Sequence, residues 1–539
     1  MPQPSGGRAR SLIYNSILMS AAAIVMRAVG VGFGVWISNR VGAEVMGLYS
    51  LIMGVWGFAL TLATSGINLA TARTVAEAIG EGEESGGGTA RAALRRALCY
   101  AALFGLAAAA LLILGGGYIG RQWLAEERTV LPLRLLGISL PAIAVSSALS
   151  GYFSAVRRVW KSAVSQLCEQ AVKIVCVTRL IARLLPLGAE HCCTALVLGG
   201  VISEVVSALV GYILYRLDLS AHMGRGRSRF GGRESTRRLL QNALPVSVSS
   251  YVRSALTTIE HILIPRGLQK YGAGRGEALA AYGMLNAMVM PVVMFPYAMI
   301  NSVTGMLLPE MSAAASLGQR RRISYISARV WRLTLIFGIG AAGVFICFAD
   351  ELGQVLYGSS EASRLIRSLG PLMPVMYLDT VTDSMLKGLG EQVFTMNVNI
   401  ADAALSAGLV ALLVPALGIY GYIAVLYISE LVNFGLSAAR LLRICGMRPR
   451  IYRWVVAPLL SVIGATTTAT LLFGGWHGAT GGAFCVTLPA ALTLAWHIIV
   501  ALLLFFAFLY ATGGIDSELC AWLISRTFGR ESKIDAPPS

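Results

Sequence analysis

Residues 12–77 read LIYNSILMSAAAIVMRAVGVGFGVWISNRVGAEVMGLYSLIMGVWGFALTLATSGINLATARTVAE, and this stretch decides the fold. Two long apolar runs make up most of it, near residues 12–37 and 47–71. A helix that crosses a membrane needs about 20 consecutive, mainly apolar residues. The stretch therefore predicts two membrane-spanning helices at the start of the chain.

The same pattern returns near the middle of the chain, 233 residues later (282 minus 49). Further landmarks keep this register, and the acid Glu169 falls on the acid Asp402. A constant register of this kind indicates a duplicated unit of about 230 residues. The identical pairs are Tyr49 and Tyr282, Asn68 and Asn301, Glu77 and Glu310, Leu136 and Leu369, Gly137 and Gly370, and Pro141 and Pro374.

The composition extends the membrane interpretation to the whole chain. Of the 539 residues, 56% are hydrophobic and only 13% are charged, so we expect lipid to surround most of the protein. Hydropathy predicts fourteen helices, near residues 12–37, 47–71, 97–118, 135–155, 162–182, 193–215, 240–264, 278–306, 333–349, 369–386, 393–415, 421–439, 454–474 and 484–511.

These helices predict an all-α polytopic membrane protein with internal symmetry. Six helices per copy is an even number, so both copies enter the membrane in the same orientation, and a pseudo-two-fold axis along the membrane normal should relate them. The last two helices have no counterpart in the duplication. The expected parts are an N-lobe (1–215), a basic cytoplasmic linker (216–239), a C-lobe (240–440), the two added helices with the segment after them (441–525) and a disordered tail (526–539).

The net charge of +17 does not indicate nucleic acid binding, because the charges follow the expected topology. Most of the 44 Lys and Arg residues fall in alternate loops and at the two ends, with clusters at 225–238 and 320–322. Basic loops mark the cytoplasmic side. We therefore expect a multi-pass protein of the cytoplasmic membrane with both termini in the cytoplasm, the lipid bilayer as a partner, no nucleic acid partner and a monomeric state.

No sequence motif indicates an enzyme. The chain contains no phosphate-binding loop of the Walker type, no HExxH and no GxSxG, so energy for transport would come from a gradient and not from ATP. The nine cysteines lie mostly within apolar runs and lack the spacing of a zinc site. We expect no catalytic residues, no metal site and no cofactor beyond Na⁺ or H⁺ coupling.

Ionisable residues at membrane depth are the main functional signal. A charged side chain there costs several kcal/mol, on the order of 3 kcal/mol or more, unless it faces water or a partner. We therefore expect these residues to line an aqueous cavity or to pair between helices. They are Arg27, Glu169, Lys173, Glu204, Arg253, Glu260, Asp379, Asp383, Asp402 and Glu430.

Arg27 and Glu260 occupy equivalent positions in the two copies (260 minus 27 is 233) but carry opposite charges. The planar guanidinium of arginine can hold a phosphate through two parallel hydrogen bonds. We expect Arg27 and Arg253 to contact a substrate phosphate; for Arg27 the alternative is an ion pair with an acid such as Glu260. The spacing of Glu169 and Lys173, one turn apart, favours an internal ion pair, with substrate contact as the alternative.

Carboxylates gather in the second copy. Asp379 and Asp383 share one helix face at a spacing of four residues, and Asn399 and Asp402 lie on the next expected helix. Clustered carboxylates repel one another when charged, so such a site either holds a proton or binds a cation. The pattern predicts a Na⁺ or H⁺ coupling site, and the alternative is a merely hydrophilic cavity lining.

Four stretches resemble the stage V sporulation protein B branch of the multidrug, oligosaccharidyl-lipid and polysaccharide exporter superfamily, also called the MOP or MATE-like superfamily. The resemblance extends from about residue 12 to 440. The stretches are RVGAEVMGLYSLIMGVWGFALTLATSGINLATARTVAE (40–77), LSGYFSAVRRVWKSAVSQLCEQAVKI (149–174), ALPVSVSSYVRSALTTIEHILIPRGLQK (243–270) and ALAAYGMLNAMVMPVVMFPYAMINSVTGMLLPEMSAA (278–314).

This resemblance implies two six-helix lobes, alternating access and the flipping of a polyprenyl-pyrophosphate-linked saccharide, such as a cell-wall precursor of the lipid II type. The family's basic residue on the first helix falls on Arg27, and its acid on the seventh falls on Glu260, where aspartate is more usual. Asn68 and Asn301, equivalent in the two copies, complete the expected substrate site. The related lipid II flippases carry further cavity arginines on their second and eighth helices, which this chain lacks at depth.

Two other functions compete with the flippase. A cation-coupled multidrug antiporter on the same scaffold would use the acids to bind cationic drugs. A non-transporting scaffold for envelope or spore assembly would depend on its loops and not on the cavity charges. The two added helices favour the flippase, because a lipid-linked substrate needs a lateral groove for its tail and a compact drug does not.

Overall fold

The structure, a computed structural model, describes residues 6–64, 66–80, 88–222, 232–447, 449–472 and 488–515. The expected tail and the centre of the expected linker lie outside these residues. The described residues form helices joined by short turns, and no strand occurs among them. The all-α prediction is confirmed.

The helices cover most of the expected apolar runs, but their bounds differ. The expected helix 47–71 is interrupted between α1 and α2, the expected helix 278–306 is interrupted between α9 and α10, and α11 begins well before the expected residue 333. Helices α6 and α7 extend further into the expected linker than the pattern predicts. The α-helices are α1 (Gly6–Thr64), α2 (Ile67–Gly80), α3 (Gly88–Tyr118), α4 (Val130–Ala155), α5 (Val159–Leu184), α6 (Ala189–His222), α7 (Gly232–Tyr271), α8 (Arg275–Gly283), α9 (Met290–Val293), α10 (Tyr297–Ser316), α11 (Arg320–Cys347), α12 (Ala349–Tyr357), α13 (Ser360–Leu369), α14 (Met373–Gly388), α15 (Gln392–Leu417), α16 (Ile419–Cys445), α17 (Ala457–Leu472) and α18 (Leu488–Ala511).

The first two expected spans meet at Gly42 within α1. The backbone there has φ 82° and ψ 168°, a conformation that side chains with a Cβ rarely adopt. Gly42 therefore ends one helical run and lets the next begin without a loop, which is why the boundary between the two runs is so short in the sequence.

Nine helices of the described residues are long and apolar enough to cross a membrane. Their apolar side chains remain largely exposed: only 22% of the most apolar window is buried in α15, and the same share in Ala491–Ala511 of α18. Exposed apolar surface of this extent requires a nonaqueous neighbour, so the chain is a multi-pass membrane protein. The total of fourteen spans stays a prediction, because helices such as α5, α7 and α14 carry the charges at depth and are less apolar.

Contacts between residues divide the chain into two compact units. Unit 1 consists of Met1–Asn39, Met288–Ser406 and Tyr420–Ser539, and unit 2 consists of Arg40–Ala287 and Ala407–Ile419. Helix α7 thus belongs to unit 2 together with α2–α6. The lobe boundaries drawn from the duplication stay a prediction about symmetry and do not describe these units.

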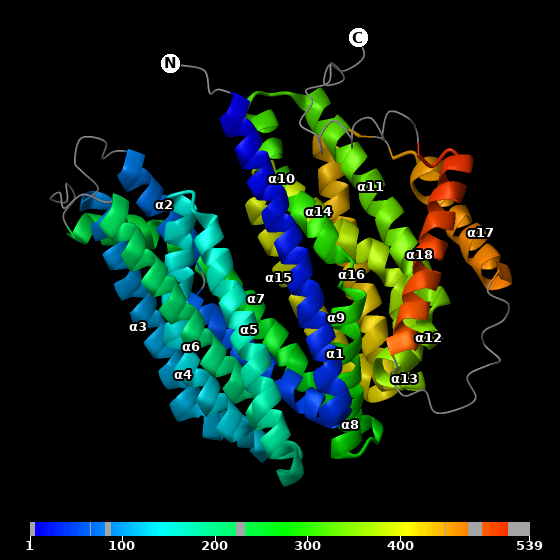
Figure 1. Cartoon of the computed structure of the whole chain (residues 1–539), viewed down its shortest axis with the longest axis horizontal. Helices are drawn as coiled ribbons and strands as arrows, with labels where there is room; N and C mark the ends of the chain where they lie inside the picture. Colours follow the sequence, from blue (N-terminus) through cyan, green and yellow to red (C-terminus); the bar gives the residue numbers. More distant parts are fainter. Residues whose placement is uncertain are drawn as a thin grey trace. The chain divides into compact units, whose positions relative to one another are not determined.

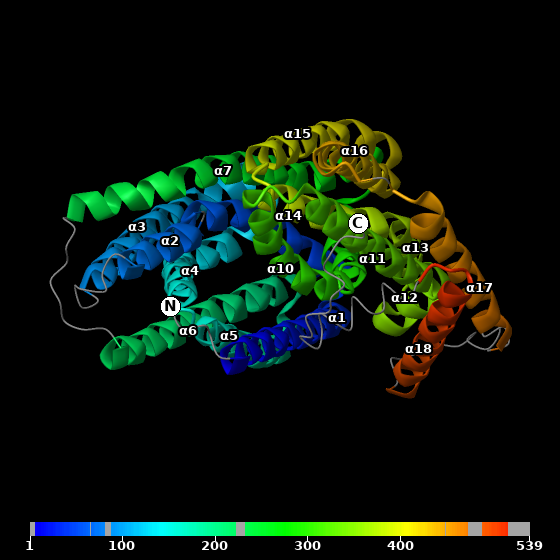
Figure 2. The same cartoon turned by 90° about the horizontal axis from the view of Figure 1, so that it is seen from above.

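Unit 2 is built around α4, which packs against α2, α3 and α6. Helices α3, α4 and α6 lie side by side in both views (Figure 1, Figure 2). Small residues let these helices approach closely: a Cβ on Gly105 would lie 2.8 Å from Cα of Pro141. Close backbone approach through small residues is typical of helices packed in lipid.

A similar contact joins α1 to α8 within unit 2. A Cβ on Gly47 would lie 1.9 Å from the carbonyl oxygen of Leu279, and one on Gly283 would lie 2.3 Å from the carbonyl oxygen of Ala43. Both distances are shorter than any real Cβ contact. The two helices therefore touch backbone to backbone, and both positions require glycine.

Polar contacts hold the turn between α3 and α4. Arg128 donates to both carboxylate oxygens of the buried Glu126, over 2.8 Å and 3.1 Å, and to Glu44 over 2.9 Å. Burial alone would raise the pKa of Glu126, but the hydrogen bonds and charge of Arg128 outweigh it, and the pKa falls below its ordinary value of 4.5. This turn is thus tied to α1 by charge as well as by the chain.

Unit 1 has α11 at its centre, in contact with α14, α17 and α18. Helices α17 and α18 lie side by side in Figure 1 and Figure 2. The buried guanidinium of Arg332 on α11 donates to the carbonyl oxygen of Gly514, just after α18, over 2.7 Å. A hydrogen bond also joins α14 to α9 in unit 1, because the Tyr377 hydroxyl donates to the carbonyl of Val293 over 3.0 Å.

Candidate functional site

The carboxylates predicted to couple transport to an ion lie in unit 1, on α14 and α15. Both Asp379 and Asp383 are buried, with exposed fractions of 9% and 7%, and so is Asn399, at 9%. Their burial follows from the sequence spacing, because a step of four residues places both aspartates on one face of α14, and that face packs into the unit. Three of the four predicted residues are therefore buried within one unit, and their role in ion coupling stays a prediction.

Amides and hydroxyls surround the two aspartates. Asn399 donates to Oδ2 of Asp383 over 3.0 Å, and Ser437 on α16 donates to its Oδ1 over 3.4 Å. Asn433, also on α16, donates to Oδ2 of Asp379 over 3.2 Å. We name this group, Asp379, Asp383, Asn399, Asn433 and Ser437, the carboxylate cluster.

One cation lies at the edge of the carboxylate cluster. Nζ of Lys387 is 3.5 Å from Oδ2 of Asp383, one turn along α14, and its side chain is 42% exposed. A partly exposed ion pair of this length is weak. Lys387 therefore balances part of the negative charge without closing the cluster to a small cation or proton.

Asp402 on α15 and Glu430 on α16 form a second pair of acidic residues near the carboxylate cluster. Ser429 donates a short hydrogen bond to Oδ1 of Asp402, and Glu430 follows on α16, half-buried. The structure thus places Asp402 against α16, where Glu430 interacts electrostatically with both Asp402 and Asp383. In the described part of the chain, no three His, Cys, Asp or Glu side chains converge as a transition-metal or calcium site would require.

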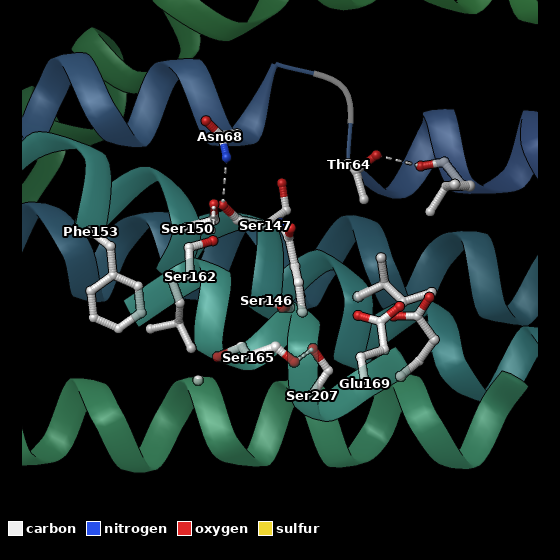
Figure 3. Close-up of a pocket in the computed structure, with 16 residues that line it drawn as sticks. Thr64, Asn68, Ser146, Ser147, Ser150, Phe153, Ser162, Ser165, Glu169 and Ser207 are labelled. Atoms are coloured by element: carbon white, nitrogen blue, oxygen red, sulfur yellow. Dashed lines mark hydrogen bonds between the residues drawn. The ribbon is translucent and has the colours of Figure 1, made fainter. Parts of the chain in front are cut away.

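A cavity lies in unit 2, among α4, α5 and α6 and lined also by residues of α1 and α2. It has a volume of about 330 Å³. Figure 3 shows serines of α4 and α5 facing it together with Glu169, Ser207 and, from the other side, Thr64 and Asn68. We name it the serine pocket. Its lining residues are Leu60, Thr64, Asn68, Ile143, Ser146, Ser147, Leu149, Ser150, Phe153, Ser162, Ser165, Gln166, Glu169, Glu204, Ser207 and Gly211.

The structure locates the predicted substrate residues individually. Arg27 on α1 and Arg253 on α7 have exposed side chains, and Glu260 on α7 is half-buried. Asn68 lines the serine pocket and donates to the carbonyl of Ser147 over 3.4 Å. Asn301 lies in α10, and its side chain is outside the described part of the structure. Their roles as substrate contacts stay predictions.

Sequence reasoning missed a buried charge cluster at the end of α6. Asp218, 3% exposed, lies 2.8 Å from Nζ of the buried Lys161, contacts Arg158 and accepts from the Tyr152 hydroxyl over 3.0 Å. The signal was present in the chain, because Arg158 and Lys161 lie one turn apart at the start of α5. Asp218, the acid that pairs with both, is distant in sequence, so only the packing of α5 against α6 reveals these ion pairs.

The serine pocket was also missed. Seven of its lining residues are Ser or Thr, spread over α1, α4, α5 and α6. Single serines in membrane helices are common packing residues, so no one helix identifies the site. Glu169 does line the pocket, whereas its expected partner Lys173 does not.

The sequence profile of the family described as "Polysaccharide biosynthesis protein" matches residues 12–315, more than half of the chain. The protein belongs to this family. A second profile, MatE, matches residues 272–412 of the same protein. This polysaccharide biosynthesis protein family member thus also carries the signature of the MATE-like exporters, which confirms the resemblance to the MOP superfamily.

Two sporulation proteins are similar to this chain in sequence. The family member is similar to stage V sporulation protein B of Bacillus subtilis, at 26% identity over 416 residues, which cover 76% of this chain and 80% of the relative. It is also similar to sporulation protein YkvU of the same organism, at 24% identity over 66% of this chain and 77% of that protein.

Solved structures share the fold. The inward closed conformation of lipid II flippase MurJ aligns with a TM-score of 0.69 at 13% identity, over 95% of this chain and all of that one. An inward-facing multidrug resistance MATE family transporter of the MOP superfamily aligns with a TM-score of 0.62 at 17% identity, over 79% of this chain and 98% of that one. At these identities the likeness shows the fold alone.

Proposed function

We propose that the protein is a flippase that moves a polyprenyl-pyrophosphate-linked saccharide across the cytoplasmic membrane by alternating access. The family match and the relationship to stage V sporulation protein B support a role in polysaccharide or cell-wall precursor transport. The likeness to lipid II flippase MurJ supports the same architecture. Both termini would lie in the cytoplasm, on the side of the basic loops. The protein would act as a monomer without a catalytic centre.

One observation carries the proposal: polar groups are enclosed by helices whose outer faces are apolar. The serine pocket and the carboxylate cluster both lie among such helices. Ionisable side chains at depth are costly unless they face water or a partner, and they commonly mark the pathway of a substrate or ion. A carrier for a hydrophilic headgroup attached to a lipid tail needs this combination.

In this proposal, basic residues bind the substrate and acidic residues bind the coupling ion. Arg27 and Arg253 supply exposed guanidinium groups that suit a pyrophosphate, which prefers bidentate donors. The carboxylate cluster supplies buried anionic oxygens that suit H⁺ or Na⁺. In this scheme the cation or proton resets the carrier after the anionic headgroup has left.

The test is a flipping assay with the full-length protein reconstituted in vesicles that hold a fluorescent polyprenyl-pyrophosphate-linked saccharide. Replacing Arg27→Ala should lower the flipping rate about 10- to 100-fold, since a charge-assisted hydrogen bond contributes about 1.5–3 kcal/mol. Arg27→Lys should retain part of the rate. The matched control is Arg121→Ala, because Arg121 is exposed and its ion pair with Glu127 is on the surface. An Arg27→Ala variant that flips at the wild-type rate contradicts the phosphate role.

The MatE profile match over residues 272–412 favours a second candidate, a cation-coupled multidrug antiporter. In that case the carboxylate cluster would bind a cationic drug. The same vesicles, loaded with ethidium and given a Na⁺ or pH gradient, separate the two functions. Ethidium transport without flipping of the lipid-linked saccharide would replace the flippase proposal.

A further inference from the structure

The serine pocket has a distinctive chemistry. Its sixteen lining residues include seven hydroxyls, two amides and two carboxylates, and none is Lys, Arg or His. A phosphate in this pocket would meet Glu169 and Glu204, and Lys173, the cation that interacts with both acids, is not among the lining residues. The pocket is therefore unsuited to a pyrophosphate and suited to an uncharged hydrogen-bonding group.

Three of the seven hydroxyls of the serine pocket donate to backbone carbonyls, and Ser150 and Ser162 are hydrogen-bonded to each other over 2.9 Å. Ser165 donates to the carbonyl of Lys161 over 3.3 Å, Ser207 donates to the carbonyl of Ser165 over 3.4 Å, and Thr64 donates to the carbonyl of Leu60 over 2.8 Å. A hydroxyl whose hydrogen is used in this way keeps lone pairs that can accept a bond. Together with Glu169 and Glu204, these oxygens favour a ligand that carries several O–H donors.

The size of the pocket argues for a small molecule. Its volume of about 330 Å³ falls within the range of ligand pockets, roughly 300–1,000 Å³. A single water or bare ion needs only about 10–15 Å³ of such space. The lining also includes the aliphatic surfaces of Leu60, Ile143 and Leu149, which suit the carbon face of a ring.

We propose that the serine pocket binds one uncharged sugar residue of the transported lipid through its hydroxyls, at a site separate from the one that holds the pyrophosphate. The identity of the cargo rests on the proposed function. The binding of a sugar in this pocket does not, because it can be measured without transport.

A glycine in the wall of the pocket allows the site to be filled. A Cβ on Gly211 of α6 would lie 3.5 Å from Oγ of Ser165 and 3.7 Å from Cδ1 of Leu149, which are ordinary contact distances. Gly211→Leu therefore extends a side chain into the cavity without striking backbone. The matched control is Gly200→Leu on the same helix, because a Cβ there has nothing within 4 Å and Gly200 is not in the lining.

The experiment is saturation-transfer-difference NMR on the full-length protein in detergent. The probes are methyl β-D-glucoside, N-acetylglucosamine, glucuronate and inorganic pyrophosphate. We expect signals from at least one of the two uncharged sugars with the wild type and with Gly200→Leu, and at least a fivefold loss with Gly211→Leu. Pyrophosphate should not compete. Ser165→Ala, a smaller change in the same wall, should weaken the signal in part and guards against a folding defect in Gly211→Leu.

Three results would overturn the proposal: no signal from either uncharged sugar, a signal that is equal in Gly211→Leu, or displacement of the sugar by pyrophosphate. A direct signal from tetramethylammonium, with none from the uncharged sugars, would instead indicate a cation site. The vesicle assay keeps the two proposals apart. Sugar binding with no flipping refutes the flippase but retains the pocket, and flipping that is unchanged by Gly211→Leu refutes the pocket but retains the flippase.

Discussion

The side-chain amide of Asn399 donates a hydrogen bond of 3.0 Å to Oδ2 of Asp383, and this bond joins α15 to α14 inside unit 1. The same amide also donates to the carbonyl of Thr395 over 2.7 Å. Both hydrogens of the Asn399 amide are therefore used, and its orientation is fixed. Asp383 is left with an anionic oxygen held in place by neutral donors and one partly exposed lysine.

This arrangement predicts that Asp383 couples transport to an ion. Asp383→Asn keeps the shape of the side chain and removes its charge, so flipping in vesicles should lose its response to an imposed Na⁺ or pH gradient. The measurement compares initial rates with and without the gradient. The control is Asp350→Asn, since the Asp350–Arg367 pair is exposed on both sides. An Asp383→Asn variant with an unchanged gradient response would rule out this role.

Asp218 should contribute strongly to the stability of unit 2. It is buried and meets Lys161, which is also buried, so Asp218→Asn leaves a positive charge without its counterion. Breaking a buried ion pair costs about 3–5 kcal/mol. Thermal unfolding followed by intrinsic fluorescence should show a large drop in the midpoint temperature.

The double variant Lys161→Met with Asp218→Leu tests the cause of that drop. Apolar replacement of the two buried partners removes the buried stranded charge, and the side chain of Arg158, 30% exposed, keeps access to solvent, so the double variant should recover much of the loss. Glu127→Gln, which breaks an exposed pair with Arg121, should change stability by less than about 1 kcal/mol. If the double variant is as unstable as Asp218→Asn alone, the loss comes from packing and not from charge.

Gly47 should tolerate no side chain. An alanine Cβ would lie 1.9 Å from the carbonyl oxygen of Leu279, so α8 must move away from α1. Overpacking of this kind costs about 1–3 kcal/mol. Gly47→Ala should lower the thermal midpoint, whereas Gly57→Ala on the same helix, with nothing within 4 Å of the new Cβ, should leave it equal or raise it. Equal stability of the two variants would contradict the close approach.

The Glu126–Arg128 pair predicts a pH dependence. The pKa of Glu126 lies below its ordinary value of 4.5, so its contribution to stability is present above about pH 4.5 and is lost as the pH falls through the lowered folded value. The difference in thermal midpoint between wild type and Glu126→Gln should therefore be largest near neutral pH and shrink below about pH 4. A difference that grows as the pH falls would have the wrong sign for this pair.

The sequence pointed to Asp379, Asp383 and Asn399 because their signal is local, and it did not point to Asn433 or Ser437, which come from α16. Asp379 and Asp383 share a helix face by spacing alone, and Asn399 lies at the start of the next helix, so a short connection brings it near. The helices themselves were predictable for the same reason, since each apolar run is continuous.

The serine pocket and the Asp218 cluster were not predictable, because their partners come from separate helices. Ser165 and Ser207 are far apart in sequence, as are Lys161 and Asp218. The residues around one partner do not indicate which distant residue it contacts. Helix-to-helix registry decides such contacts. The break at Gly42 falls between the two expected spans, whereas the break between α1 and α2 was hidden, because the apolar run from 47 to 71 continues through it.

The bond from Arg332 to the carbonyl of Gly514 has a practical consequence for making the protein. A truncation before residue 514 would remove the acceptor of a buried guanidinium, and expression yield should fall even though no membrane helix has been shortened. An affinity tag or fluorescent fusion is better joined after Ile515, where this acceptor is retained.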